Sequence, residues 1–121
     1  MKYYGICLIT KKVSTMVDFY KRIFIVNSKG DDNHADLEIG GLNLSIFSEK
    51  GMQELAPNSM DKAGSGNLTI EFEVEDVDIE YLRINKLGIQ ILKQPTSYPW
   101  GSRAFWFRDP DGNIIDIFSR L

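Results

Sequence analysis

Apolar and polar positions along the chain follow two periods, and the same succession of periods occurs twice. Apolar residues recur at helical intervals over Val13–Ile25 and Asp76–Leu87, which predicts an amphipathic helix in each segment. Other segments alternate at every second position or form short apolar runs, as half-buried and buried strands do. The predicted strands span Tyr3–Thr10, Ile25–Lys29, Ala35–Ile39, Leu42–Phe47, Asn67–Val74, Ile89–Leu92, Arg103–Arg108 and Ile114–Phe118.

Glycine, proline and small polar residues mark where these elements end. The Gly-Gly pair at 40–41 and the Asp-Pro-Asp-Gly run at 109–112 each predict a turn between two strands. Gly88 stands where the second helix should stop, and Ser14 or a neighbour is the candidate cap of the first helix.

Residues 51–66 interrupt the pattern, because Pro57, Gly64 and Gly66 lie among small polar residues. This segment is interpreted as a linker or flexible loop. It separates a first module, about residues 1–50, from a second, about residues 67–121. Each module has the order strand–helix–strand–strand–strand. The sequence therefore predicts an α+β fold, a single domain over 1–121 built from two βαβββ modules.

Strand alternation divides the side chains of the second module between two faces. The face predicted to pack under the helices carries Leu68, Ile70, Phe72, Val74, Phe105, Phe107, Ile115 and Ile117. The predicted apolar face of the second helix carries Val77, Ile79, Leu82 and Leu87. The opposite face of the sheets carries Thr69, Glu71, Trp106, Arg108, Ile114, Asp116 and Phe118, with Cys7, Asn43, Ser45 and Phe47 from the first module.

Composition excludes several classes of partner. The net charge of −3, with scattered basic residues, argues against nucleic acid. No run approaches the ~20 apolar residues of a membrane span, and Ile6–Ile9 is too short for the core of a signal peptide. Cys7 is the only cysteine, which predicts a reducing, cytoplasmic location. We expect Cys7 to be a small buried hydrophobe.

Three segments carry a resemblance to a known family. They are Phe72–Asp78 at a strand-to-helix junction, Pro99–Arg103 with Phe107–Asp116 in the closing hairpin, and the Phe19-Tyr20 pair of the first helix. Together they resemble the glyoxalase/bleomycin-resistance/extradiol-dioxygenase (vicinal oxygen chelate) superfamily, and are most similar to its metal-free bleomycin-resistance-type branch. The resemblance implies a cupped mixed sheet with helices on its outer face. It also implies a small molecule on the concave face, and a homodimer.

Metal-dependent members of that superfamily hold a divalent ion at four equivalent strand positions, which the resemblance places at Gly5, Ser45, Thr69 and Asp116. Glycine offers no ligand, and hydroxyl groups are poor ligands beside imidazole and carboxylate. Only Asp116 is competent. We therefore expect no metal and no cofactor, and catalytic residues are not assigned.

The preferred hypothesis is a metal-independent protein that binds or sequesters a small aromatic or cationic compound. The candidate ligand-binding residues are Trp106, Asp116, Arg108, Glu71, Trp100, Asn43 and Phe47. Trp106 offers a stacking surface and Asp116 a hydrogen-bond acceptor. The alternatives are a metal-dependent lyase, isomerase or dioxygenase of the same superfamily, and a partner-binding module marked by an exposed apolar patch.

Purely structural roles for these residues also remain open. Arg108 could pair with Asp116 or Glu71 across the sheet instead of binding an anion. Trp106 could be a core aromatic, and Trp100 a packing plug or dimer contact. His34 is interpreted as an exposed loop residue, with a substrate contact or a metal ligand as its alternative.

Overall fold

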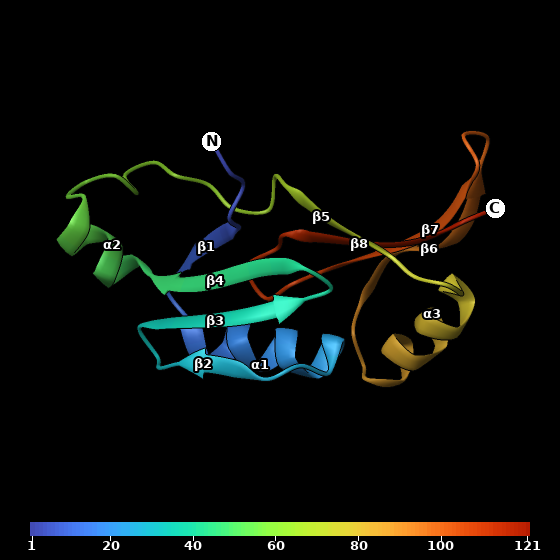
Figure 1. Ribbon diagram of the computed structural model, residues 1–121, viewed down its shortest axis with the longest axis horizontal. Coiled ribbons are helices and arrows are strands. Elements are labelled where there is room, and N and C mark those ends of the chain that lie inside the picture. The colour runs from blue at the N-terminus through green and yellow to red at the C-terminus, as the bar shows by residue number, and fades with distance from the viewer. The chain divides into compact units, whose positions relative to one another are not determined.

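Two units, residues 1–63 and residues 64–121, make up the computed structural model, which describes residues 1–121 (Figure 1). The first unit contains β1 (Ile6–Thr10), α1 (Val13–Phe24), β2 (Ser28–Gly30), β3 (His34–Ile39), β4 (Leu42–Ser48) and α2 (Glu49–Leu55). The second contains β5 (Thr69–Glu73), α3 (Val77–Lys86), β6 (Ile91–Tyr98), β7 (Ser102–Arg108) and β8 (Ile114–Arg120). None of the helices has the length and apolar content that crossing a membrane requires.

The two units repeat one topology. The strand orders are β1-β4-β3-β2 and β5-β8-β7-β6. In each sheet the first strand pairs in parallel with the last, and the remaining pairs are antiparallel. The predicted α+β fold of two βαβββ modules is confirmed.

In the first unit α1 covers one face of the sheet. Met16, Tyr20 and Ile23 are fully buried, as are Leu44 and Ile46 of β4. These helix residues lie at intervals of four and three, so they share one side of α1. Burial of this stripe accounts for most of the stability of a helix this short.

The ends of α1 differ from expectation. The helix begins at Val13, but no side chain caps it, so the prediction for Ser14 is wrong. It ends at Phe24, and the C-cap residue Ile25 that follows has left-handed φ and ψ angles, both 54°. Glycine usually occupies such a position, because a β-branched side chain is strained there.

Part of the predicted linker is helical. Ser48 caps α2 by accepting a hydrogen bond from the Gly51 amide at 2.9 Å. A Cβ on Gly51 would approach the Phe47 ring to 2.5 Å. Gly51 therefore permits close packing of α2 against β4. From the sequence, this glycine was interpreted as part of a loop.

The core of the second unit follows the predicted alternation, except that Leu68, predicted to be buried, is exposed. Phe105, Phe107, Ile115 and Ile117 are buried on the face that α3 covers. From α3, however, Val77 and Ile84 are buried, and Tyr81 packs edge-on against Phe105 at 5.4 Å.

Two residues of the predicted apolar face of α3 point to solvent. Ile79 is 63% exposed and Leu82 is 57% exposed. The buried residues 77 and 84 and the half-buried Tyr81 lie at intervals of four and three and define a different side of the helix. The predicted apolar face is therefore wrong at these two positions.

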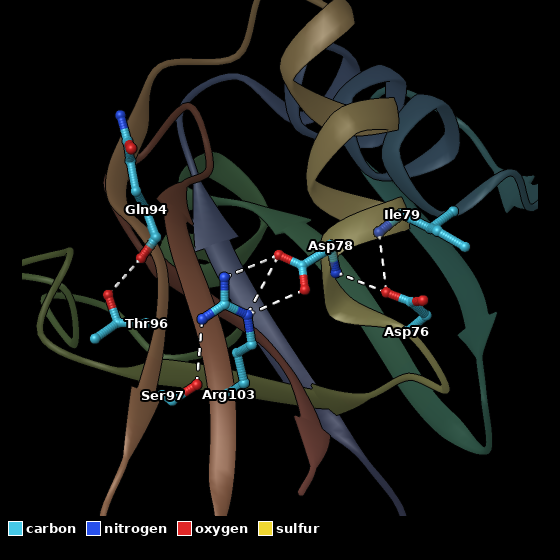
Figure 2. A network of polar contacts seen from close by, with 7 residues as sticks. All are labelled: Asp76, Asp78, Ile79, Gln94, Thr96, Ser97 and Arg103. Atoms are coloured by element: carbon cyan, nitrogen blue, oxygen red, sulfur yellow. Dashed lines mark hydrogen bonds and ion pairs between the residues drawn. The ribbon is translucent and has the colours of Figure 1, made fainter.

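Polar contacts fix the start of α3 to the sheet (Figure 2). The Asp76 carboxylate accepts hydrogen bonds from the amides of Asp78 and Ile79, at 3.0 and 3.2 Å. Asp78 in turn accepts from both Nε and Nη2 of Arg103 on β7, each at 3.0 Å. Arg103 also donates to Ser97 of β6 at 3.2 Å, so one guanidinium joins three elements.

Strand β6 is longer than the predicted Ile89–Leu92. It runs to Tyr98 and pairs with β7 through two irregularities, between Ile91 and Lys93 and between Lys93 and Thr96. Pro95 lies in this second irregular stretch of an edge strand, where proline costs least.

The predicted turn at 109–112 is present. Asp109 is buried, and its carboxylate accepts from the amides of Asp111 and Asn113. Gly112 has a φ of 89°, which suits glycine. The turn aligns β7 with β8.

Candidate functional site

A row of four side chains crosses the sheet of the second unit on the face opposite α3. Strand register places Glu71 of β5 beside Asp116 of β8, Asp116 beside Trp106 of β7, and Trp106 beside Lys93 of β6. Because neighbours in register project from the same face, these four form a continuous line. The predicted pairing of Trp106 with Asp116 is thus a direct cross-strand contact.

A pocket of about 240 Å³ lies at the acidic end of this row. Its lining consists of Glu71, Trp100, Gly101, Ser102, Asp116, Phe118 and Arg120. Of the predicted site residues, Asp116, Glu71 and Trp100 therefore share one pocket, and Trp106 adjoins it.

Asp116 is the most perturbed acid of the pocket. Partial burial raises the pKa of its carboxyl, and the charge of neighbouring Glu71 raises it further. The indole N–H of Trp106 opposes this rise as the smallest of the three effects. The contact nevertheless falls short of hydrogen-bond geometry, because Oδ1 of Asp116 and Nε1 of Trp106 are both buried without a partner.

Three aromatic rings continue the row toward β6. Tyr98 stacks on Trp100 at 4.5 Å with an interplanar angle of 6°, and on Trp106 at 6.5 Å and 12°. Lys93 Nζ lies 5.6 Å from the Tyr98 ring centre and 5.9 Å from that of Trp106. This stack of three rings ends at Trp100, which is 73% exposed and offers an open ring face.

Tyr98 and Lys93 were missed as site residues. Their position depends on the irregular register of β6, because a bulge reverses which face later residues occupy. The Tyr98 hydroxyl is a third buried polar atom without a partner.

Arg108 lies away from this pocket. It is in register with Ile114, at the far end of β7, and its Nη1 donates to the Gly112 carbonyl at 2.7 Å. The expected pairing with Asp116 or Glu71 is therefore wrong. Arg120 is the basic residue that lines the pocket. It forms an ion pair with Glu73, with 2.8 Å between its Nε and the carboxylate.

The first unit carries an equivalent row. Cys7, Ser45, Asp36 and Lys29 are in register across β1, β4, β3 and β2. The Ser45 hydroxyl donates to Asp36 at 2.6 Å. Cys7 is exposed, so its predicted burial is wrong. Its thiol is still partly shielded, and this desolvation raises its pKa, with a further contribution from Asp36.

The remaining predicted site residues also belong to the first unit. Asn43 donates to the Tyr4 carbonyl at 3.0 Å and lines a separate pocket. Phe47 packs edge-on against His34 at 5.6 Å and lies against Gly51 of α2. His34 opens strand β3 instead of lying in a loop, and its Nε2 is 3.4 Å from Asp36.

The four positions of the implied metal site do not suit a transition metal. A Cβ at Gly5 would lie 2.3 Å from the Asn43 carbonyl oxygen, so that position admits only glycine. Ser45 is engaged with Asp36, and Thr69 offers only a hydroxyl. Asp116 is the one carboxylate. No cluster of three His, Cys, Asp or Glu side chains suited to a metal ion is present.

Relatives in sequence and structure agree with this architecture. The chain is 27% identical over 128 residues to the Uncharacterized protein YraH of Bacillus subtilis (strain 168), covering all of both chains. A glyoxalase/bleomycin resistance protein/dioxygenase from Nocardioides has a TM-score of 0.82 at 24% identity, covering 97% of this chain and 82% of that one. A glyoxalase/bleomycin resistance protein/dioxygenase family enzyme from Burkholderia phytofirmans PsJN has a TM-score of 0.84 at 15% identity, covering 97% of each chain.

The structural likenesses, at these identities, concern the fold. The family itself follows from the sequence match, since the model for the Glyoxalase-like domain covers residues 3–121, nearly the whole chain. The resemblance to the superfamily, carried by the closing hairpin and the strand-to-helix junction, is confirmed, while the metal-free branch stays a prediction. With its repeated βαβββ units, the chain belongs to the glyoxalase-like domain family.

Proposed function

We propose that this chain is a metal-independent protein that binds and sequesters a small, flat cation in the pocket of the second unit. The observation that carries the proposal is the buried, unpartnered Asp116 Oδ1 beside the indole of Trp106. A buried carboxylate oxygen without a donor is costly. A ligand with an N–H donor attached to a flat group relieves that cost and gains a stacking surface.

The charge gradient along the row gives the ligand an orientation. Glu71 and Asp116 form the negative end, and Lys93 forms the positive end beyond Trp106. Arg120 does not neutralise the acidic end, because it pairs with Glu73. The cationic part of the ligand therefore lies at Glu71 and Asp116, and its apolar part lies toward Trp100.

The expected interaction free energies are large enough for selective binding. Aromatic stacking contributes about 0.5–1.5 kcal/mol and a desolvated cation–π contact about 2 kcal/mol. Together these change affinity by more than about tenfold. Trp100, already stacked on Tyr98, can hold a flat ligand without losing much rotamer freedom.

Metal independence is supported by the donor chemistry at Gly5, Ser45, Thr69 and Asp116, which leaves one competent ligand. Elemental analysis of protein purified without chelator tests this part. We expect far less than one transition metal per chain, and a stoichiometric metal lost in Asp116→Asn would contradict the proposal.

Benzamidine and benzamide form a matched pair for testing the ligand class, because both are flat and only benzamidine is cationic. Titration monitored by amide NMR shifts should show tighter binding of benzamidine, with shifts at Asp116 and its neighbours. Asp116→Asn should weaken benzamidine binding roughly tenfold and leave benzamide unchanged. Glu75→Gln, an exposed charge change outside the pocket, is the control. Equal binding of the two compounds would overturn the cationic assignment.

A further inference from the structure

A second pocket, of about 460 Å³, lies within the first unit. Its polar lining includes Tyr4, Lys29, Asp36, Glu38, Asn43 and Ser45. Register explains how they meet: Asp36 is opposite Ser45 on one side and Lys29 on the other, and Glu38 is opposite Asn43. Alternation places all of them on the sheet face away from the buried Leu37 and Leu44.

Some of these groups are satisfied within the protein and others are not. Asp36 accepts from Ser45 at 2.6 Å and lies 3.4 Å from His34 Nε2. Asn43 uses its amide N–H to hold the Tyr4 carbonyl, so its Oδ1 is left as an acceptor. Lys29 and Glu38 are exposed and form no ion pair with each other or with another residue.

We propose that this pocket binds a small zwitterion, with its carboxylate at Lys29 and its ammonium at Glu38 and the Asn43 side-chain oxygen. Lys29 and Glu38 are diagonal neighbours across β2 and β3, so their backbone positions are about 7–8 Å apart. Long side chains of opposite charge on two such positions can hold a molecule with a few carbons between its ionic groups. Tyr4, exposed at the rim, can cover the carbon chain.

The arrangement disfavours ligands with a single charge. A carboxylate at Lys29 is repelled by Asp36 directly across from it, and a simple anion has nothing to offset this repulsion, whereas the ammonium of a zwitterion gains the attraction of Glu38. A cation at Glu38 alone leaves Lys29 unpaired and close by. Only a ligand with both charges engages both free groups, so the two charges contribute to specificity as well as affinity.

This inference does not depend on the pocket of the second unit. The two equivalent rows have different chemistry: Glu71, Asp116, Trp106 and Lys93 in one, Cys7, Ser45, Asp36 and Lys29 in the other. The row of the first unit has no aromatic ring and carries hydrogen-bonding groups where the row of the second unit has Trp106. The repeat therefore supports two distinct ligand classes.

The test uses γ-aminobutyrate as the zwitterionic probe, with butylamine and butyrate as its single-charge counterparts. NMR titration of the isotopically labelled full chain should show saturable shifts at Lys29, Glu38 and Asn43. The dissociation constant for γ-aminobutyrate should be lower than for either counterpart by roughly fivefold or more. Absence of saturable shifts, or equal affinity for all three probes, would overturn the proposal.

Single-charge variants separate the two ends of the site. Lys29→Gln should weaken γ-aminobutyrate binding to the level of butylamine, and Glu38→Gln should weaken it to the level of butyrate. Lys86→Gln and Glu75→Gln make the same charge changes at exposed positions of the second unit and should leave binding unchanged. If these controls weaken binding as much, the effect is one of net charge and the pocket is not the site.

Discussion

Trp106 and Asp116 lie directly opposite each other on β7 and β8, and neither the indole nitrogen nor carboxylate Oδ1 has a hydrogen-bond partner. Burial and the charge of Glu71 raise the pKa of the Asp116 carboxyl. A raised pKa in the folded state means that the ionised form is less favourable there than in the unfolded chain. The ligand-free pocket is therefore held at some cost in stability.

Asp116→Asn should accordingly be no less stable than the wild type at pH 7, while losing cation binding. The folded protein holds the Asp116 proton more tightly than the unfolded chain. The penalty is therefore absent below the ordinary pKa of 3.8, and it grows as pH rises through the raised folded value. Urea unfolding at several pH values measures this. A variant clearly less stable than wild type at pH 7 would assign Asp116 a structural role.

Gly5→Ala should destabilise the chain by about 2 kcal/mol or more, because the added Cβ would lie 2.3 Å from the Asn43 carbonyl oxygen. Gly64→Ala is the matched control, since nothing lies within 4 Å of the position and its φ is not positive. The control should change the unfolding free energy by less than about 0.5 kcal/mol. Equal effects in chemical denaturation would contradict the close approach of the segment before β1 to β4.

Ile25→Gly should stabilise the chain by about 1 kcal/mol, because Ile25 adopts a left-handed conformation that glycine reaches without strain. The side chain is 76% exposed, so its loss removes little packing. Thermal unfolding would measure the gain as a higher midpoint. A lower midpoint would show that the Ile25 side chain makes stabilising contacts that the structure of a single chain does not contain.

Asp78→Asn should lower the free energy of unfolding slightly, because it weakens the hydrogen bonds that Arg103 donates to this carboxylate. Arg103 donates hydrogen bonds to the Asp78 carboxylate, and this contact raises the pKa of Arg103 in the wild type. A guanidinium is protonated at neutral pH even without that contact, so Arg103 stays charged in the variant. Because Asp78 is partly exposed, high salt should reduce the difference between the two proteins. A difference that does not change with salt would indicate packing rather than charge as the cause.

We expect the chain to form a homodimer in solution, as the resemblance implies. Static light scattering at micromolar concentration should give twice the mass of one chain. The variant Trp100→Ala then tests whether Trp100 contacts the ligand or the second chain of the dimer. If Trp100 lies in the interface, the variant should shift toward monomer. A wild-type mass of one chain would contradict the expectation.

Local pattern determined most of the fold. The alternation of Phe105 and Phe107 and of Ile115 and Ile117 identified the buried face, because side chains of a strand alternate whatever the strand packs against. The turn at 109–112 was likewise predictable, since its buried carboxylate bonds to amides only a few residues away. These features also brought Trp106 opposite Asp116.

Tertiary structure decided what depends on register, bulges and packing between elements. Lys93 and Tyr98 join the row only because β6 is irregular, and no local pattern specifies a bulge. The Arg108 guanidinium donates to a carbonyl of the following turn instead of pairing with Asp116. Gly51 lies inside α2, where the Phe47 ring leaves no room for a side chain. In each case strand pairing or packing between elements, rather than the residue's own propensity, determines its role.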